Sequence, residues 1–292
     1  MKYFILLHLV CFFLMANFSL AQQDTITTKD HSVLFGEIKE MSQGVLTLKT
    51  SYSKNDFKIE WLEVQSLQSF NNFRLTLKTG ERYYGKIRKD TVDQRIIITD
   101  YTSGNIKTDI DDLVYLKQVN QGHIFDIMNL ALDAGYSFTK TNNLHQLNGN
   151  LHADYYRKKW GVATNVNIIR NVQDNAPSTK RISASVEFKF FLKNDFFLSS
   201  LGDYYSNDDQ QLKLRGTHNL SLGQYLIHTN KVYLNYSLGI ANTNENYIGD
   251  LPNTNNFEGT IKVEYNMFDM GDLNMFTNIT AYPSFTDWGR IR

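Results

Sequence analysis

The sequence predicts an all-β protein made of two different parts. The first is a tandem pair of small SH3-like or Sm-like β-barrel units, and the second is an antiparallel up-and-down β-barrel of the outer-membrane type, incomplete at its C-terminus. Three observations support this prediction: two stretches near the N-terminus repeat each other, strict apolar–polar alternation begins near residue 129, and the composition favours strands. The 292 residues include 17 tyrosines and 19 phenylalanines but only 3 prolines.

Residues 1–21 have the three-part pattern of a secretory signal peptide. Lys2 gives a positive start, an apolar core follows, and Ser19-Leu20-Ala21 provides a small–x–small cleavage site. A single-pass membrane anchor is the alternative, but the cleavage pattern favours removal after Ala21. The single cysteine, Cys11, lies inside this segment. We therefore expect an exported bacterial chain without disulfides or thiol chemistry.

The charge balance excludes one class of partner. Lysine plus arginine (30) equal aspartate plus glutamate (30), so no basic field attracts nucleic acid, and we expect no nucleic-acid partner. After residue 21, no apolar run approaches the ~18 residues that a membrane helix requires. Any membrane insertion must then use a β-barrel.

Two copies of one small unit follow the signal peptide. The stretch "KDHSVLFGEI" (29–38) aligns with "KTGERYYGKI" (78–87), and "FKIEWLEVQSL" (57–67) aligns with "IKTDIDDLVYL" (106–116), both at an offset of 49 residues. Each copy has the turn residues and apolar runs of four or five short strands. We assign the repeats to residues 22–70 and 71–118 and a linker to 119–128.

The second copy contains the spacing that opens a phosphate-binding loop, given by Gly80, Gly85 and Lys86. Such a loop needs a hydroxyl after the lysine and a helix after the loop, but Ile87 follows and no helical pattern does. The first copy has His31 and Glu37 where the second has Gly80 and Lys86. The stretch is therefore predicted to be a hairpin turn and a strand, with Gly36 and Gly85 at a bend or bulge. No nucleotide and no cofactor is expected.

Residues 129–292 alternate apolar and polar side chains over long segments. In the first of these, Leu130, Leu132, Ala134, Tyr136 and Phe138 share one face. Nine strands are expected, over about 130–138, 147–156, 160–171, 182–192, 195–205, 212–222, 232–240, 261–267 and 272–282. Most are ~10 residues or longer, which is the length of a membrane-spanning strand rather than of a globular one (~5–6). A soluble two-sheet sandwich would alternate too, but length and regularity favour the membrane barrel.

The connections between these strands are alternately short and long. Short ones are expected near 157–159, 193–195, 228–230 and 269–272, and longer ones near 140–146, 171–180, 206–211 and 242–256. Membrane barrels have short periplasmic turns and longer outer loops. With the repeats in the periplasm, the longer loops face the exterior.

Taken together, these stretches resemble a known family. The residues "GEIKEMSQGVLTLKTSYSKNDFKIEW" (36–61), "GERYYGKI" (80–87) and the strands from about 129 are similar to the domain of unknown function 481 family of salt-induced outer-membrane proteins, of the Bacteroidetes type with N-terminal tandem SH3-like repeats. The resemblance implies an outer-membrane β-barrel without an assigned biochemical role. It brings no catalytic residues.

Three sets of residues are candidates for chemical sites. His152 lies beside Asp154 on the polar face, where an ordinary lumen side chain is expected. His218 interrupts an apolar face, and a lipase-like role at the lipid surface is the alternative to a plain interfacial side chain. Three aspartates resemble a calcium site but are expected to form a solvated acidic edge, matched by glutamates in the first copy; they are Asp109, Asp111 and Asp112. No catalytic, cofactor-binding or metal site is predicted.

The leading hypothesis is a non-enzymatic outer-membrane β-barrel with a periplasmic β-module, with membrane lipid and a periplasmic protein or cell-wall component as partners. The alternatives are a secreted soluble β-sandwich binding protein and an outer-membrane lipid hydrolase. Because barrels of one chain use even strand numbers, and "GRIR" (289–292) has the pattern of a tenth strand, we expect the natural chain to continue.

Overall fold

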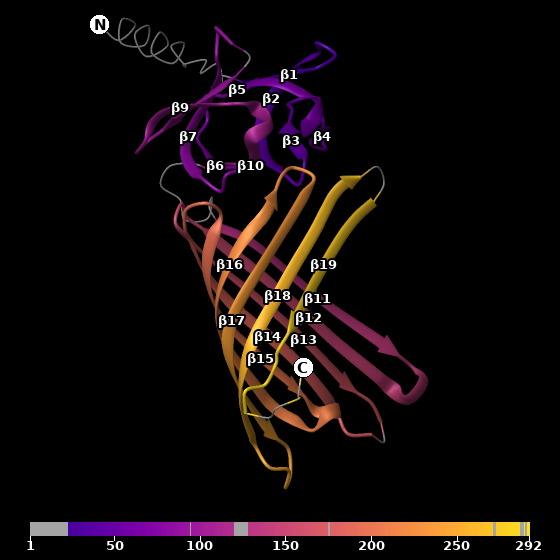
Figure 1. Ribbon diagram of the computed structural model, residues 1–292. Coiled ribbons are helices and arrows are strands. Elements are labelled where there is room, and N and C mark those ends of the chain that lie inside the picture. The colour runs from indigo at the N-terminus through magenta and orange to yellow at the C-terminus, as the bar shows by residue number, and fades with distance from the viewer. Residues whose placement is uncertain are drawn as a thin grey trace, which may run out of the picture.

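Two antiparallel β-sheets follow one another along the chain, ten strands in the first and nine in the second (Figure 1). The computed structural model describes residues 23–93, 95–119, 128–174, 176–270, 273–286, 289 and 291–292. The predicted signal peptide and almost all of the predicted linker lie outside the described residues. Within that part of the chain, no helix has the length and apolarity needed to cross a membrane. The all-β prediction is confirmed.

The first sheet contains two successive sets of five strands. The first set is β1 (Asp24–Thr28), β2 (Val33–Ser42), β3 (Val45–Lys49), β4 (Phe57–Glu60) and β5 (Val64–Gln68), with the 3-10 turn η1 (Trp61–Glu63) before β5. The second set is β6 (Phe73–Leu77), β7 (Arg82–Lys89), β8 (Ile96–Asp100), β9 (Gly104–Thr108) and β10 (Leu113–Gln118), with η2 (Ile110–Asp112) before β10. The starts of β1 and β6, of β2 and β7, and of η1 and η2 are each 49 residues apart.

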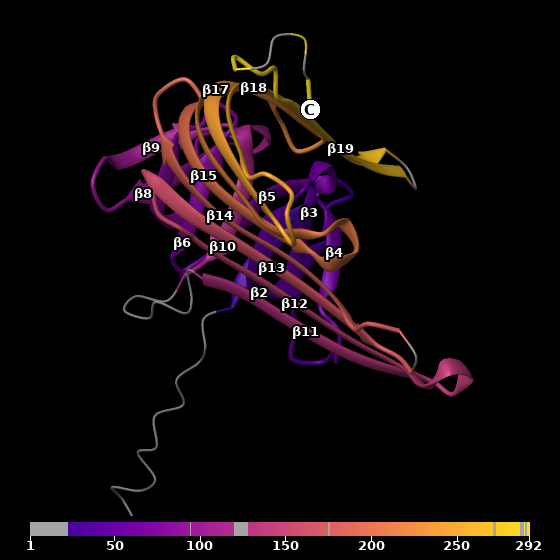
Figure 2. The ribbon, with the colours of Figure 1, turned by 90° about the horizontal axis from the view of Figure 1, so that it is seen from below.

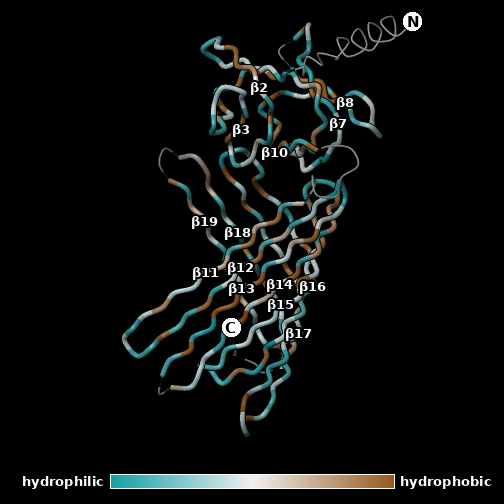
Figure 3. Tube along the Cα trace, turned by 180° about the vertical axis from the view of Figure 1, so that it is seen from behind, coloured by the Kyte–Doolittle hydropathy of each residue, from teal (hydrophilic) through white to brown (hydrophobic). Residues whose placement is uncertain are grey.

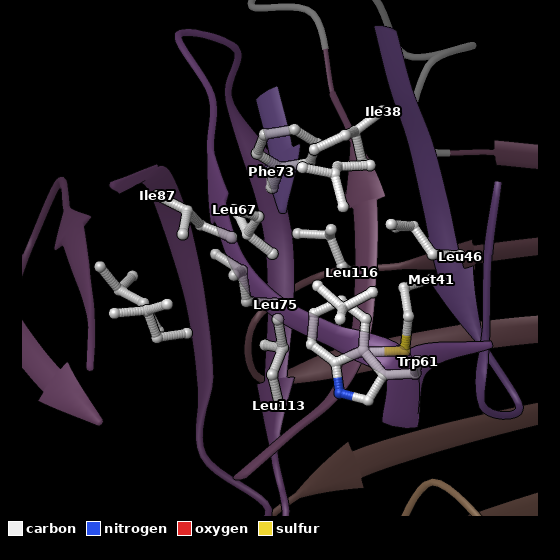
Figure 4. Close-up of a cluster of buried hydrophobic side chains, with 14 of the residues drawn as sticks. Ile38, Met41, Leu46, Trp61, Leu67, Phe73, Leu75, Ile87, Leu113 and Leu116 are labelled. Atoms are coloured by element: carbon white, nitrogen blue, oxygen red, sulfur yellow. The ribbon is translucent and has the colours of Figure 1, made fainter. Parts of the chain in front are cut away.

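The two sets share one sheet and one hydrophobic core. In each set the last strand pairs with the first, β5 with β1 and β10 with β6. β10 also crosses to β2, where Leu116 is opposite Met41 and Lys117 is opposite Glu40. In Figure 4, Met41 and Trp61 lie beside Leu113 and Leu116, and the cluster continues to side chains such as Phe73 and Ile87. A unit of about 49 residues buries too little apolar surface alone, so joining two units in one core is the stable arrangement.

Gly36 and Gly85 are not at the bend or bulge that the sequence predicted, and glycine is needed at these positions for another reason. The register shift in β2 falls between Ile38 and Glu40, after Gly36, and Gly85 pairs in register with Asp100. A side chain at either glycine would collide with the carbonyl oxygen of the neighbouring strand, Lys49 in the first set and Thr99 in the second. Both positions need glycine because two strands approach closely there.

The second sheet is a nine-stranded meander in sequence order, so all nine predicted strands are confirmed. Its strands are β11 (Met128–Thr139), β12 (Leu144–Tyr156), β13 (Trp160–Val172), β14 (Thr179–Phe191), β15 (Phe196–Asn207), β16 (Leu212–His228), β17 (Val232–Tyr247), β18 (Thr254–Met270) and β19 (Leu273–Ala281). The sheet is curved (Figure 2). No pairing between β11 and β19 is found among the described residues.

The connections predicted to be long are shorter than expected. The segment 242–256 is predicted to be a loop, but Asn242–Tyr247 belongs to β17, and Glu245 is opposite Thr254 in β18. Only 248–253 remain as the connection. The ladder continues because polar side chains bond across it, as Asn242 Nδ2 does to Asn255 Oδ1 at 2.8 Å. The other three connections that were predicted to be long are 140–143, 173–178 and 208–211.

The two faces of the second sheet differ as predicted. Large apolar side chains on one face are exposed, including Leu132 (74 %), Leu238 (53 %) and Ile279 (64 %). Figure 3 shows hydrophobic and hydrophilic residues alternating along these strands. The buried hydrophobic cluster of the described residues consists of side chains from the first sheet alone. Beyond β19, Pro283 and Ile291 form an isolated antiparallel bridge, at the segment predicted to start another strand.

Candidate functional site

The first sheet lies against the short connections of the second, at one end of its strands (Figure 1). We call residues 24–118 the module and its contact with these connections the junction. The connections that contact it are 157–159, 192–195 and 229–231. In the second of these, Asn194 and Asp195 both have positive φ (55° and 57°), as a tight hairpin turn with the twist of its strands requires.

Arg74 on β6 joins the module to the end of β12. Its guanidinium is buried and donates to the Tyr156 carbonyl oxygen at 3.0 Å and to the Tyr115 hydroxyl at 2.7 Å. It also lies over the Tyr115 ring, 4.9 Å from the centroid. Tyr84 donates its hydroxyl to the same Tyr156 carbonyl at 3.2 Å. Burial raises the pKa of Tyr115, so its hydroxyl stays neutral and accepts the bond from Arg74.

Lys158 forms a second link, to a buried acid of the module. Its ammonium donates to Asp100 Oδ2 at 3.1 Å and to Thr102 Oγ1 at 2.9 Å. Burial raises the pKa of Asp100, but hydrogen bonds from Thr102, the Tyr84 N–H and Lys158 lower it more, so it lies well below its usual value. Asp100 is therefore a carboxylate that holds the turn at 157–159 in place.

Asn230 links the third connection to β10. Its Nδ2 donates to the Leu113 carbonyl oxygen at 2.7 Å in a buried position. Tyr233 donates to the Val114 carbonyl oxygen at 3.3 Å. Gly44, with φ +78°, lies so close to Asn230 that an added Cβ would be 2.9 Å from the Asn230 carbonyl oxygen. The fit at this position depends on a residue without a side chain.

Gly80 forms the turn between β6 and β7 and packs on the β14–β15 turn. The predicted hairpin and strand are confirmed: Gly80 N–H bonds to the Leu77 carbonyl oxygen at 2.8 Å, and β7 follows. A Cβ at Gly80 would overlap the Asp195 carboxylate. Asp195 in turn pairs with His228 at 3.1 Å, with both side chains buried. The glycine that resembles part of a phosphate loop is here a packing residue at the junction.

The polar face of the second sheet carries charged networks. Near the junction, Glu187 bonds Lys189 at 3.3 Å and Ser199 at 2.7 Å. These side chains line a cavity of 140 Å³. On the same cavity, Glu264 accepts a hydrogen bond from Asn235 at 3.0 Å. Towards the other end, Glu245 pairs with Arg215 at 2.6 Å and Glu258 pairs with Arg292 at 2.8 Å. Each of the glutamates Glu187, Glu245 and Glu258 thus has a cationic partner, which offsets the cost of removing its charge from water.

His152 lines a second cavity on this face, of 270 Å³. One ring nitrogen is 2.7 Å from Asn165 Oδ1 and the other is 3.0 Å from Asp154 Oδ1. Asp154 also accepts from Asn129 Nδ2 at 2.8 Å. The structure thus places His152 in a polar network beside Asp154, as the sequence predicted.

His218 lies on the exposed apolar face, opposite Gly202. Its ring meets the edge of Tyr204 at a centroid distance of 5.6 Å. Among the described residues, no hydrogen bond or ion pair of its side chain is found. Opposite His218 on the two neighbouring strands are Gly202 and Asn242.

Two of the three acidic residues after β9, Asp109 and Asp112, are paired with cations of the module. Asp109 Oδ1 is 3.0 Å from Arg95 Nε, and Asp112 pairs with Lys78 and accepts from Thr108 at 3.0 Å. In the part of the chain that the structure describes, no group of histidine, cysteine, aspartate and glutamate side chains could hold a metal ion.

A family model described as "Protein of unknown function, DUF481" matches residues 132–291. The chain belongs to this family. The match covers the nine-stranded sheet, and the stretches 36–61 and 80–87, which carried part of the sequence resemblance, lie outside it. No curated protein and no solved structure matches the chain.

The sequence reasoning missed the junction. Arg74, Asn230 and Asp195 are ordinary strand or turn residues in the sequence, and their partners are far along the chain. Two weak features of the sequence point to a contact here. Short connections such as "RKK" (157–159) and "KND" (193–195) are charged, and the hairpins that face them contain glycines, which have positive φ in the structure. Neither feature identifies its partner.

Proposed function

We propose that this chain is a non-enzymatic outer-membrane protein, in which the nine-stranded sheet forms the wall of a membrane barrel and the module is held in the periplasm. The observation that carries the proposal is the exposed apolar face of the second sheet. Large side chains such as Leu132, Leu238 and Ile279 are more than half exposed there, although burying such groups is favourable. Lipid is the surrounding that removes them from water without a second protein layer.

The length of the apolar band and the aromatic side chains at its edge support a lipid surrounding. The outward apolar residues run from Ile182 in β14 to Leu192, the first residue after that strand. This span is about 33 Å along the chain or about 24 Å across a bilayer at a ~45° tilt, against an apolar band of about 25 Å in such barrels. Near the junction, Trp160 stacks on Phe188 at 5.8 Å and meets Tyr155 at 5.5 Å. Aromatic side chains at the edge of an apolar band are typical of membrane barrels.

The soluble β-sandwich is the weaker alternative. A sandwich needs a second sheet packed over the apolar face, at about 10 Å. The module contacts the ends of the strands through Arg74, Lys158 and Asn230 instead of covering that face. The lipid hydrolase is weaker still, because His218 has the aromatic contact with Tyr204 and lacks a triad-like arrangement among the described residues.

We infer that residues 24–118 are tandem copies of one SH3-like unit and that they hold a fixed place at the periplasmic mouth of the barrel. The 49-residue offset of corresponding elements and the strand order within each set support the repeat. The junction supports the placement, because several hydrogen bonds, one buried and the others half-buried, fix the module to the turns. A module held in this way presents its remaining surface to a periplasmic protein or a cell-wall component.

Gel migration of the membrane fraction tests the proposal. We expect the unboiled protein to migrate differently from the boiled protein, as folded membrane barrels do.

Val186→Lys places a charge on the apolar face in mid-strand and should cost about 2–4 kcal/mol of folding free energy in the bilayer. The matched control Ser185→Lys faces the polar side opposite Asp203 and should fold nearly as well. Identical migration with and without boiling, or equal losses in both variants, would contradict the proposal.

A further inference from the structure

An open cavity of 740 Å³ lies at the junction. Four segments line it: the start of β7 with the preceding turn (79–83), Ser103 in the β8–β9 connection, the β12–β13 turn at Lys158 and Lys159, and the end of β14 with its turn (190–194). Its volume lies within the range of ~300–1,000 Å³ that is usual for small-molecule sites.

The lining is basic. Lys158, Lys159, Lys193 and Arg82 contribute four cationic groups, against one carboxylate, Glu81. Lys158 is bonded to Asp100, and Arg82 lies over the Phe191 ring at 3.6 Å. Lys159 and Lys193 are exposed, and no ion pair or hydrogen bond of their side-chain nitrogens is found among the described residues. Two cations therefore remain available to an anion from two different turns.

One wall of the cavity is apolar and continues into the face assigned to lipid. Phe190 and Leu192 line the cavity and are 39 % and 42 % exposed. Phe190 pairs across strands with Trp160, which stacks on Phe188. The basic groups and the apolar band thus meet within one site, at the level where the headgroups of a bilayer would lie.

We propose that this cavity binds an anionic phospholipid, with its phosphate between Lys159 and Lys193 and its acyl chains along Phe190 and Leu192. The proposal rests on the proposed function, since the acyl chains must belong to a bilayer that surrounds the sheet. A free phosphate shares the charge chemistry but has no use for the apolar wall. The bound lipid would bridge two turns that the module also contacts and would fix the module to the membrane surface.

Binding to the purified full chain in detergent micelles tests the proposal, with native mass spectrometry to count lipid adducts. The probes are dioctanoyl phosphatidylglycerol, dioctanoyl phosphatidylcholine and inorganic phosphate. We expect one site at which phosphatidylglycerol binds at least tenfold more tightly than the other two. Lys159→Gln combined with Lys193→Gln should remove that preference. The control, Lys180→Gln with Lys213→Gln, makes the same charge change on exposed lysines at the other end of the sheet and should keep it.

Folding is followed separately by heat-modifiable migration, so a failure of lipid binding in a folded barrel is distinct from a failure of the barrel. Lys193→Glu is a second variant and should also weaken phosphatidylglycerol binding, since it reverses a charge at the same exposed position. Equal binding of both lipids, equally tight binding of inorganic phosphate, or an equal loss in the control pair would overturn the proposal.

Discussion

Gly80→Ala tests the junction, because the added methyl group meets the Asp195 carboxylate in the β14–β15 connection. Gly80 has φ +80°, and its Cβ would overlap the Asp195 carboxylate. Gly104 is a matched control: it has φ +76° in a hairpin of the same module, and no atom lies within 4 Å of its Cβ position. The left-handed backbone costs alanine about 1–2 kcal/mol at either position. Overpacking at Gly80 adds about 1–3 kcal/mol.

The free energy of unfolding of the module is measured by urea titration of the full chain in detergent micelles. Trp61 is buried in the module core and reports on it when the other tryptophans are replaced by phenylalanine. We expect a loss of about 2–5 kcal/mol for Gly80→Ala and about 1–2 kcal/mol for Gly104→Ala.

A double-mutant cycle identifies the cause. Asp195→Gly removes the carboxylate that the new methyl group meets, so the extra cost of Gly80→Ala should fall by at least about 1 kcal/mol in that background. Equal losses in the two glycine variants, or the same extra loss with and without the Asp195 side chain, would show that the contact with Asp195 does not cause the loss at Gly80.

Three further predictions concern the module and the loops. Asp100→Asn should lower the free energy of unfolding at pH 7 by about 2 kcal/mol, because a buried, hydrogen-bonded carboxylate is lost. Since the folded-state pKa of Asp100 is lowered, this difference from the unmodified protein should be full above pH ~5 and shrink as the pH falls below ~4. The control Asp109→Asn, at an exposed ion pair, should change the free energy of unfolding little. The fragment 24–118 should unfold cooperatively with a β-type circular dichroism spectrum, because its core is its own; a helical spectrum would be inconsistent with this. A tag inserted near Asn253, in the connection 248–253, should be labelled on intact cells, and labelling only after permeabilisation would reverse the topology.

The strands of the second sheet and their two faces can be read from the residue pattern. Alternation has a period of two residues and needs no partner to be recognised, so all nine strands of the second sheet and their apolar side follow from the residue pattern alone. The 49-residue offset likewise located two sets of four or five short strands, because turn residues and apolar positions recur together, and the structure has five in each set. The extent of β17 and β18 was underestimated, since "NTNENY" (242–247) is polar on both faces and its pairing depends on the strand opposite.

Tertiary structure decided how the parts meet. The joining of both sets of strands in one core, through β10 beside β2, depends on contacts between stretches that look alike in sequence. The bonds of Arg74 to Tyr156 and of Asn230 to Leu113 join residues 82 and 117 positions apart. Backbone carbonyls accept these bonds, and every residue has one, so the sequence does not mark which carbonyl is used. Only the relative position of the two sheets selects the partner, and that position is set by the packing of many side chains together.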